Sequence, residues 1–122
     1  MAYVVASNDA LSITTGAVSA EQVSGTYQFT GPGTYSLYAK GSATGMNVTC
    51  IIGGNILVND SPIPFTGTAG TLDTSANPIF SQKIFGLNSK SELKFRNTSG
   101  GTLTVGYILY WDPFLGGLFK RR

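Results

Sequence analysis

Apolar and polar residues alternate with a period of two, and this pattern restricts the fold of the chain more than any other feature. It is longest near the carboxyl end, where the apolar phase comprises Leu103, Val105, Tyr107, Leu109 and Trp111. Such alternation is typical of β-strands that bury one face. No long window shows an apolar stripe with the helical period of about 3.6 residues. The sequence therefore predicts an all-β protein.

Turn-forming clusters separate the alternating segments, as at Gly31-Pro32-Gly33 and Gly53-Gly54-Asn55. Between the turns we expect strands at Tyr3–Ala6, Leu11–Thr14, Thr26–Phe29, Thr34–Lys40, Met46–Ile52, Ile56–Val58, Ile79–Phe85, Glu92–Arg96 and Leu103–Trp111. Eight or nine short strands at this spacing are typical of a β-sandwich or a β-barrel, and we expect an antiparallel sandwich. The expected core comprises Leu37, Val48, Cys50, Ile52, Leu93, Phe95, Leu103, Val105, Tyr107 and Leu109.

The chain has the size of a single domain, with 122 residues. We assign residues 1–113 to that domain, with an amino-terminal strand or arm at residues 2–6, and residues 114–122 to a tail. Charged residues make up only 11% of the chain, against about 25% in typical soluble domains. The tail contributes +3 and the rest of the chain −1 to the net charge of +2, so the body is near neutral. A surface with so little charge favours association.

The composition gives little support to catalysis. The chain has no His, which is the usual general base and zinc ligand, and its six acidic residues are scattered. Cys50 is the only cysteine and lies in the apolar phase of its strand, so we interpret it as a core residue. We therefore expect no enzyme activity, no metal and no cofactor.

The tail is the first candidate for function. It joins large apolar residues through two glycines to a basic end, and comprises Phe114, Leu115, Gly116, Gly117, Leu118, Phe119, Lys120, Arg121 and Arg122. One interpretation is that the apolar side chains fold back onto the sandwich. Another is that the tail is an arm that docks into a neighbouring subunit or partner. A contact with a membrane surface or with phosphates is a weaker alternative, because three basic residues contribute little binding to nucleic acid.

The second candidate is the uncharged segment containing Tyr3, Val4 and Val5, which is either an ordinary first strand or a strand added to another chain. A basic run at Lys83, Lys90, Lys94 and Arg96 is either a solvated face or a surface complementary to an acidic partner. Tyr27, Tyr38 and Tyr110 are aromatic residues on polar phases or near turns. They suit a subunit interface or a platform for stacking sugars, unless loops cover them.

Three segments carry a resemblance to known proteins: Thr26–Leu37, Val48–Asn55 and Leu93–Val105, the last with the turn Asn97-Thr98-Ser99-Gly100-Gly101. In their order and residue pattern these segments resemble small single jelly-roll proteins of viral particles, and most closely the cement, or decoration, proteins of tailed phages. The resemblance implies jelly-roll topology. It also implies a homotrimer that binds the major capsid protein and stabilises an icosahedral shell.

The resemblance further implies that the protein resides in the virion after assembly in the host cytoplasm. The alternatives are a minor, spike or main capsid protein of a small virus, or a carbohydrate-binding β-sandwich module. Sequence-specific binding of nucleic acid is not expected.

Overall fold

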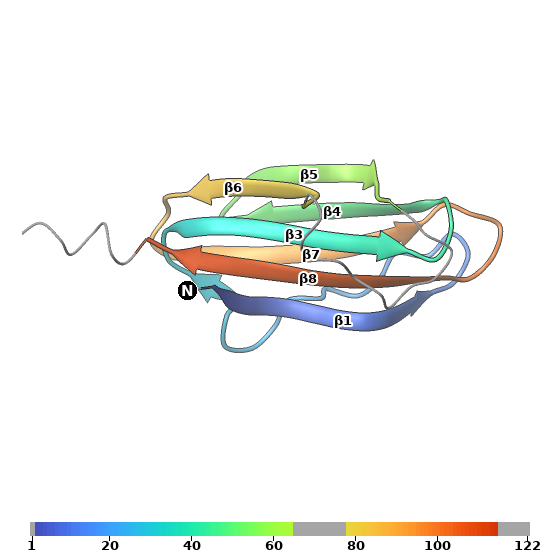
Figure 1. Cartoon of the computed structure of the whole chain (residues 1–122), viewed down its shortest axis with the longest axis horizontal. Helices are drawn as coiled ribbons and strands as arrows, with labels where there is room; N and C mark the ends of the chain where they lie inside the picture. Colours follow the sequence, from blue (N-terminus) through green and yellow to red (C-terminus); the bar gives the residue numbers. More distant parts are fainter. Residues whose placement is uncertain (1, 65–77, 115–122) are drawn as a thin grey trace, which may run out of the picture.

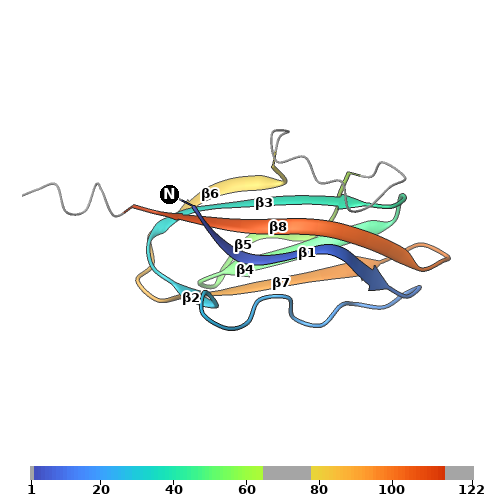
Figure 2. The same cartoon turned by 60° about the horizontal axis from the view of Figure 1, so that its bottom comes forward.

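Two β-sheets packed face to face make up the structure, a computed structural model that describes residues 2–64 and 78–114 (Figures 1 and 2). The described residues contain no helix. Their strands are β1 (Tyr3–Ile13), β2 (Phe29–Thr30), β3 (Gly33–Gly41), β4 (Met46–Ile52), β5 (Asn55–Pro62), β6 (Phe80–Ile84), β7 (Ser89–Asn97) and β8 (Leu103–Pro113). The prediction of an all-β antiparallel sandwich is confirmed.

The strands pair as in one long hairpin that has been folded over. β1 pairs with β8, β2 with β7, β3 with β6 and β4 with β5, each antiparallel, and the turn between β4 and β5 closes the hairpin. Two further pairings, β3 with β8 and β4 with β7, join these pairs into sheets. The first sheet has the order β1-β8-β3-β6 and the second β2-β7-β4-β5.

The predicted boundaries near the amino terminus are wrong in two places. Tyr3–Ala6 and the expected strand Leu11–Thr14, except for Thr14, belong to one strand, β1. Its pairing with β8 shifts between Val4 and Ala6 and again between Asn8 and Leu11. These bulges let the strand run through the polar residues that suggested a turn. The predicted strand Thr26–Phe29 is mostly a turn that follows Gly25, which has a positive φ of 85°. Only Phe29 and Thr30 form β2.

The segment of residues 14–28 covers the outer edge of β7, as the ribbon in Figure 2 shows. Backbone amides on the outer side of β7 donate hydrogen bonds to this segment. These bonds run from Ser91 N to Gln28 O, from Leu93 N to Glu21 Oε2, from Phe95 N to Ser19 Oγ and from Asn97 N to Ala17 O. Because these amides have partners, this edge cannot template pairing with another chain. In the strand order, the remaining edges are β1 and β6 of the first sheet and β5 of the second.

The core lies between the sheets and contains every residue expected there. Leu37, Val48, Cys50, Ile52, Leu93, Phe95, Leu103, Val105, Tyr107 and Leu109 are all buried. Val23, from the segment that covers β7, is fully buried with them. The covering segment is therefore part of the core and not only of the edge.

Burial of two ionisable core residues predicts a loss of stability at high pH. Burial raises the pKa of the Cys50 thiol from 9.0 to about 12, with a further contribution from the charges of Glu21 and Glu92. Burial, and then the Glu21 charge, raises the pKa of Tyr107 from 10.0 to about 12. As the pH rises, the unfolded chain therefore loses these protons at a lower pH than the folded chain does. Stability is therefore complete below about pH 9 and is lost as the pH rises toward 12, by about 1.4 kcal/mol per pH unit for each group.

Urea unfolding at about pH 8 and about pH 11 measures this loss. Tyr107→Phe is expected to flatten the part of the decline above about pH 10, and Cys50→Ala the part that begins near pH 9. A free energy of unfolding that stays constant over this range would contradict the prediction.

Candidate functional site

One end of the sandwich gathers the described parts of both candidate segments. β1 begins and β8 ends at this end, as Figure 1 shows. The antiparallel pairing also places the connections of residues 31–32, 53–54 and 85–88 there. The fold thus brings Tyr3, Val4, Val5 and Phe114 into one region.

Tyr3 is held in an aromatic cluster. Its ring centroid lies 5.6 Å from that of Tyr27 and 5.7 Å from that of Trp111, and Tyr27 and Trp111 are 6.0 Å apart. Tyr3 meets Trp111 because the two residues are directly paired across β1 and β8. Gly33 leaves room for the indole, since a Cβ at this position would lie 2.5 Å from Trp111 Nε1. In this structure the amino-terminal segment is therefore an anchored strand.

Val4 and Val5 point to opposite faces of β1. Val5 is only 7% exposed and belongs to the core, so its side chain is not available for docking in this fold. Val4 is 44% exposed and is paired with Tyr110, which places it on the outer face of the first sheet.

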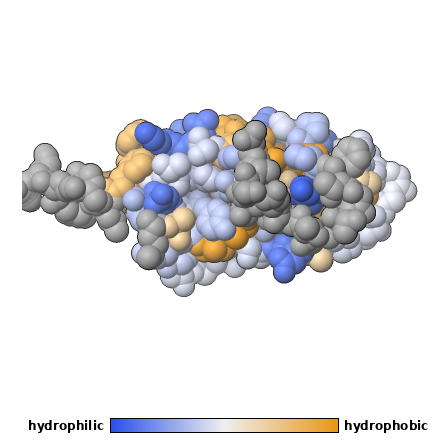
Figure 3. Space-filling view, in the orientation of Figure 1, coloured by the Kyte–Doolittle hydropathy of each residue, from blue (hydrophilic) through white to orange (hydrophobic). Residues whose placement is uncertain are grey.

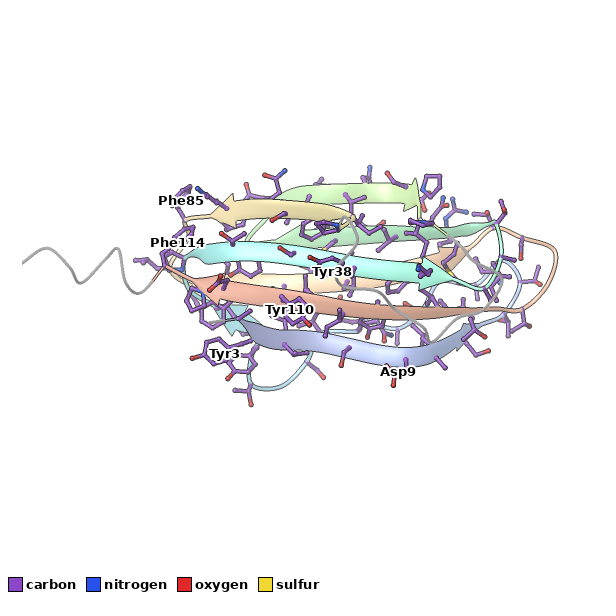
Figure 4. The ribbon with its side chains drawn as sticks, viewed as in Figure 1. Tyr3, Asp9, Tyr38, Phe85, Tyr110 and Phe114 are labelled. Carbon is purple, nitrogen blue, oxygen red and sulfur yellow. The ribbon has the colours of Figure 1, made fainter. Side chains whose placement is uncertain are left out.

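Phe114 packs on Phe85, which lies in the connection that also carries Leu87, and the sequence singled out neither of these two exposed residues. Its ring centroid is 5.4 Å from that of Phe85, and its backbone N donates to Pro32 O at 3.2 Å. Phe85 is 72% exposed and Leu87 is 86% exposed. We call Phe85, Leu87 and Phe114 the end patch. Figure 3 shows a hydrophobic area at this end, where Figure 4 places Phe85 and Phe114.

The remaining candidates of the tail lie outside the described residues. They are Leu115, Leu118, Phe119, Lys120, Arg121 and Arg122. The sequence did not predict Phe85 as a site residue, because it lies at the end of the expected strand Ile79–Phe85. In the structure β6 ends at Ile84, so Phe85 belongs to the following connection. The available signal was an apolar residue on each side of Gly86, in a connection where polar residues are usual.

The outer face of the first sheet carries two of the tyrosines singled out from the sequence. Tyr38 and Tyr110 lie on neighbouring strands, β3 and β8, with ring centroids 6.1 Å apart and ring planes at 81° (Figure 4). They line a hollow of about 350 Å³ together with hydroxyl side chains that include Ser36 and Ser81. Tyr27 is not part of this face, because it belongs to the cluster with Tyr3 and Trp111.

The outer face of the second sheet balances its charges internally. Arg96 donates to both carboxylate oxygens of Asp60, from Nε at 2.9 Å and from Nη2 at 2.6 Å. The Arg96 guanidinium lowers the pKa of Asp60. Glu92 and Lys94 line a smaller hollow of about 170 Å³ on the same sheet. The basic run is thus partly neutralised by acidic residues of the chain itself.

Residues 2–64 and 78–114 contain no group of three His, Cys, Asp or Glu side chains that is arranged to hold a metal ion. No helix among the described residues is long and apolar enough to cross a membrane. No protein-family model matches the chain, and no curated protein matches it either. The end patch and the tyrosine-lined hollow are two candidate surfaces among the described residues.

Proposed function

We propose that the protein is a structural virion protein, a capsid cement or decoration protein that binds the major capsid protein of an icosahedral shell as a homotrimer. We also infer that its sandwich is a jelly roll, which is a double-sheet fold of eight strands common among capsid proteins. The pairing of β1 with β8, β2 with β7, β3 with β6 and β4 with β5 supports this inference. A fold does not by itself define a function, so the proposal depends on a surface.

The end patch is the observation that carries the proposal. Phe85 and Leu87 are more than two-thirds exposed, and Phe114 packs directly on Phe85. Neighbouring exposed apolar side chains commonly mark a site of contact with another protein, and Phe is enriched in such contacts. The described surface also carries few charges that would hold a partner away.

The tail extends the same surface in the sequence. It begins with Phe114 and adds Leu115, Leu118 and Phe119 before its basic end. Burial of one such side chain contributes about 1.5–3 kcal/mol, whereas ordering the backbone costs about 1–2 kcal/mol per residue. The net gain from one copy is therefore small. Three copies that bind a symmetric shell together would attach firmly, because the second and third contacts become intramolecular.

Two measurements test this proposal. Native mass spectrometry of the chain is expected to give a species of three times 12.8 kDa. Viral particles from the organism that encodes the chain, purified on a density gradient, are expected to contain it in fixed proportion to their main shell protein. A chain that is absent from such particles, or monomeric when bound to them, would overturn the proposal.

Variants of the end patch are expected to separate binding from folding. The double substitution Phe85→Ser and Leu87→Ser changes side chains that are already exposed, so the thermal midpoint should shift by only a few degrees. Cosedimentation with particles should fall by about tenfold or more. Deleting residues 115–122 is also expected to lower cosedimentation with little change in the thermal midpoint. Part of the lost binding should depend on salt concentration, because the deleted segment ends in three basic residues.

Val18→Ser is the matched control, because Val18 is 56% exposed and is bridged to Arg96, far from the end patch. It should bind particles like the unchanged protein. If Val18→Ser and the end-patch variant bind equally well, the end patch is not the docking site.

A further inference from the structure

Sheet register places short hydroxyl side chains beside two tyrosines on the outer face of the first sheet. Ser36 on β3 is paired with Ser81 on β6 and with Tyr110 on β8. Tyr38 follows Ser36 by two residues and so lies on the same face. Because serine is much shorter than tyrosine, the surface is hollowed at this point. The resulting cavity of about 350 Å³, which we call the tyrosine hollow, also has Thr34 in its lining.

The two rings offer differently oriented walls. Their planes meet at 81°, so the edge of one ring faces the other across a centroid distance of 6.1 Å. Both tyrosines are partly buried, which restricts their rotamers before any ligand binds. A site whose aromatic side chains are already ordered pays less side-chain entropy on binding.

The hydroxyl groups of the hollow are also fixed. Ser36 Oγ and Ser81 Oγ share a hydrogen bond of 3.1 Å, which leaves further donor and acceptor capacity on both. The described residues that line the hollow include one carboxylate, that of Asp112, and no Lys or Arg. An anionic ligand would therefore find no cation in this lining, and an apolar ligand would bury hydroxyl groups without partners.

From this combination we propose that the tyrosine hollow binds a neutral saccharide of one or two rings. The C–H groups on one face of a sugar are slightly positive and stack on the negative face of an aromatic ring. The hydroxyl groups of the sugar exchange hydrogen bonds with Thr34, Ser36 and Ser81. The volume lies near the lower end of the range for small-molecule sites, about 300–1,000 Å³, and suits a ligand of this size. This activity goes beyond attachment to a shell and does not depend on it.

Saturation-transfer NMR of the full chain is the direct test. The probes are the methyl glycosides of glucose, galactose, mannose and N-acetylglucosamine, together with maltose and cellobiose. At least one probe is expected to receive saturation, with a dissociation constant in the millimolar range because the hollow contacts only one side of the ligand. A methyl sialoside, as the anionic comparator, is expected to give no signal.

Tyr38→Ala and Tyr110→Ala are each expected to weaken binding by about tenfold, and Ser36→Val to block it by filling the hollow. Phe29→Ala is the control, because it removes an exposed ring from the second sheet and should leave binding unchanged. Should an alanine variant fail to fold, amide shifts of the unchanged protein take its place. Changes on titration with the probe should then be confined to residues 34–38, 81 and 110.

Three outcomes would overturn the proposal: no signal from any neutral probe, binding that survives Tyr110→Ala undiminished, or shift changes located away from the hollow. If Tyr110→Ala instead converts an oligomer into monomers, the face is an interface with a second copy and not a saccharide site. Cosedimentation of Tyr110→Ala with particles separates the two proposals. Saccharide binding should be lost in this variant while attachment to particles persists.

Discussion

Val105→Asp is expected to abolish folding. Val105 is fully buried in the core, on β8, which is an inner strand of the first sheet. Its pairing partners are Leu11 on β1 and Gly41 on β3, neither of which can neutralise a carboxylate. An unpaired buried charge costs several kcal/mol, and the whole stability of a domain this size is about 5–15 kcal/mol. The strand signal in circular dichroism and the cooperative thermal transition should both disappear.

Thr104→Asp is the matched control, because Thr104 is the preceding residue on the same strand and faces outward. It is expected to retain the fold. Val105→Ala provides a graded test, with an expected loss of about 1–3 kcal/mol in urea unfolding. A folded Val105→Asp protein, or a Val105→Ala protein as stable as the original, would show that β8 does not hold the core together.

The longest alternating segments predicted both strands and core. β7 and β8 appear within three residues of their expected bounds, and the residues of their apolar phases are buried, except for Trp111, which is partly buried. The reason is that each strand has one face in the core, so that burial repeats with the same period as the side-chain direction. Where both faces of a segment are only partly buried, as in β1, the period is lost and the strand was divided in two.

The covering segment of residues 14–28 has no comparable signal. It holds β7 through irregularly spaced backbone hydrogen bonds and through two side-chain atoms, Glu21 Oε2 and Ser19 Oγ, instead of through a regular ladder. A carboxylate that accepts from a backbone amide 72 residues away leaves no local pattern in the sequence. Val23 is buried by this tertiary arrangement, and a short polar neighbourhood gave no reason to expect it.

The candidate surfaces were only partly predictable for the same reason. Tyr38 and Tyr110 stood out as aromatic residues on polar phases, but their contact depends on the pairing of β3 with β8. These strands are far apart in the sequence, so their register is a property of the whole fold. Phe114 was a candidate from the tail, whereas its partner Phe85 became visible only through their packing.

Asn97→Leu is expected to cost about 3 kcal/mol, because it removes a buried amide that joins three parts of the fold. Asn97 is fully buried at the end of β7. Its Nδ2 donates to Ile13 O at the end of β1 and to Gly101 O in the turn before β8, both at 2.8 Å. Its Oδ1 accepts from Ser99 N at 2.8 Å and from Ser99 Oγ at 2.7 Å. Leucine has the same number of side-chain heavy atoms and the same branching at Cγ, so the expected loss is chiefly one of hydrogen bonds.

The thermal midpoint of Asn97→Leu should fall by about 10 °C. Asn55→Ala is the control, because Asn55 Nδ2 also donates to a carbonyl in a hairpin turn, that of Ile52, but its residue is exposed and water can replace the bond. It should cost no more than about 1 kcal/mol. Hydrogen exchange adds a local readout, since protection of Ser99 N and of Gly16 N, which donates to Asn97 O, should fall before that of β3. If the two asparagine variants are equally stable, the turn between β7 and β8 is held by its backbone alone, and the buried amide does not couple it to β1.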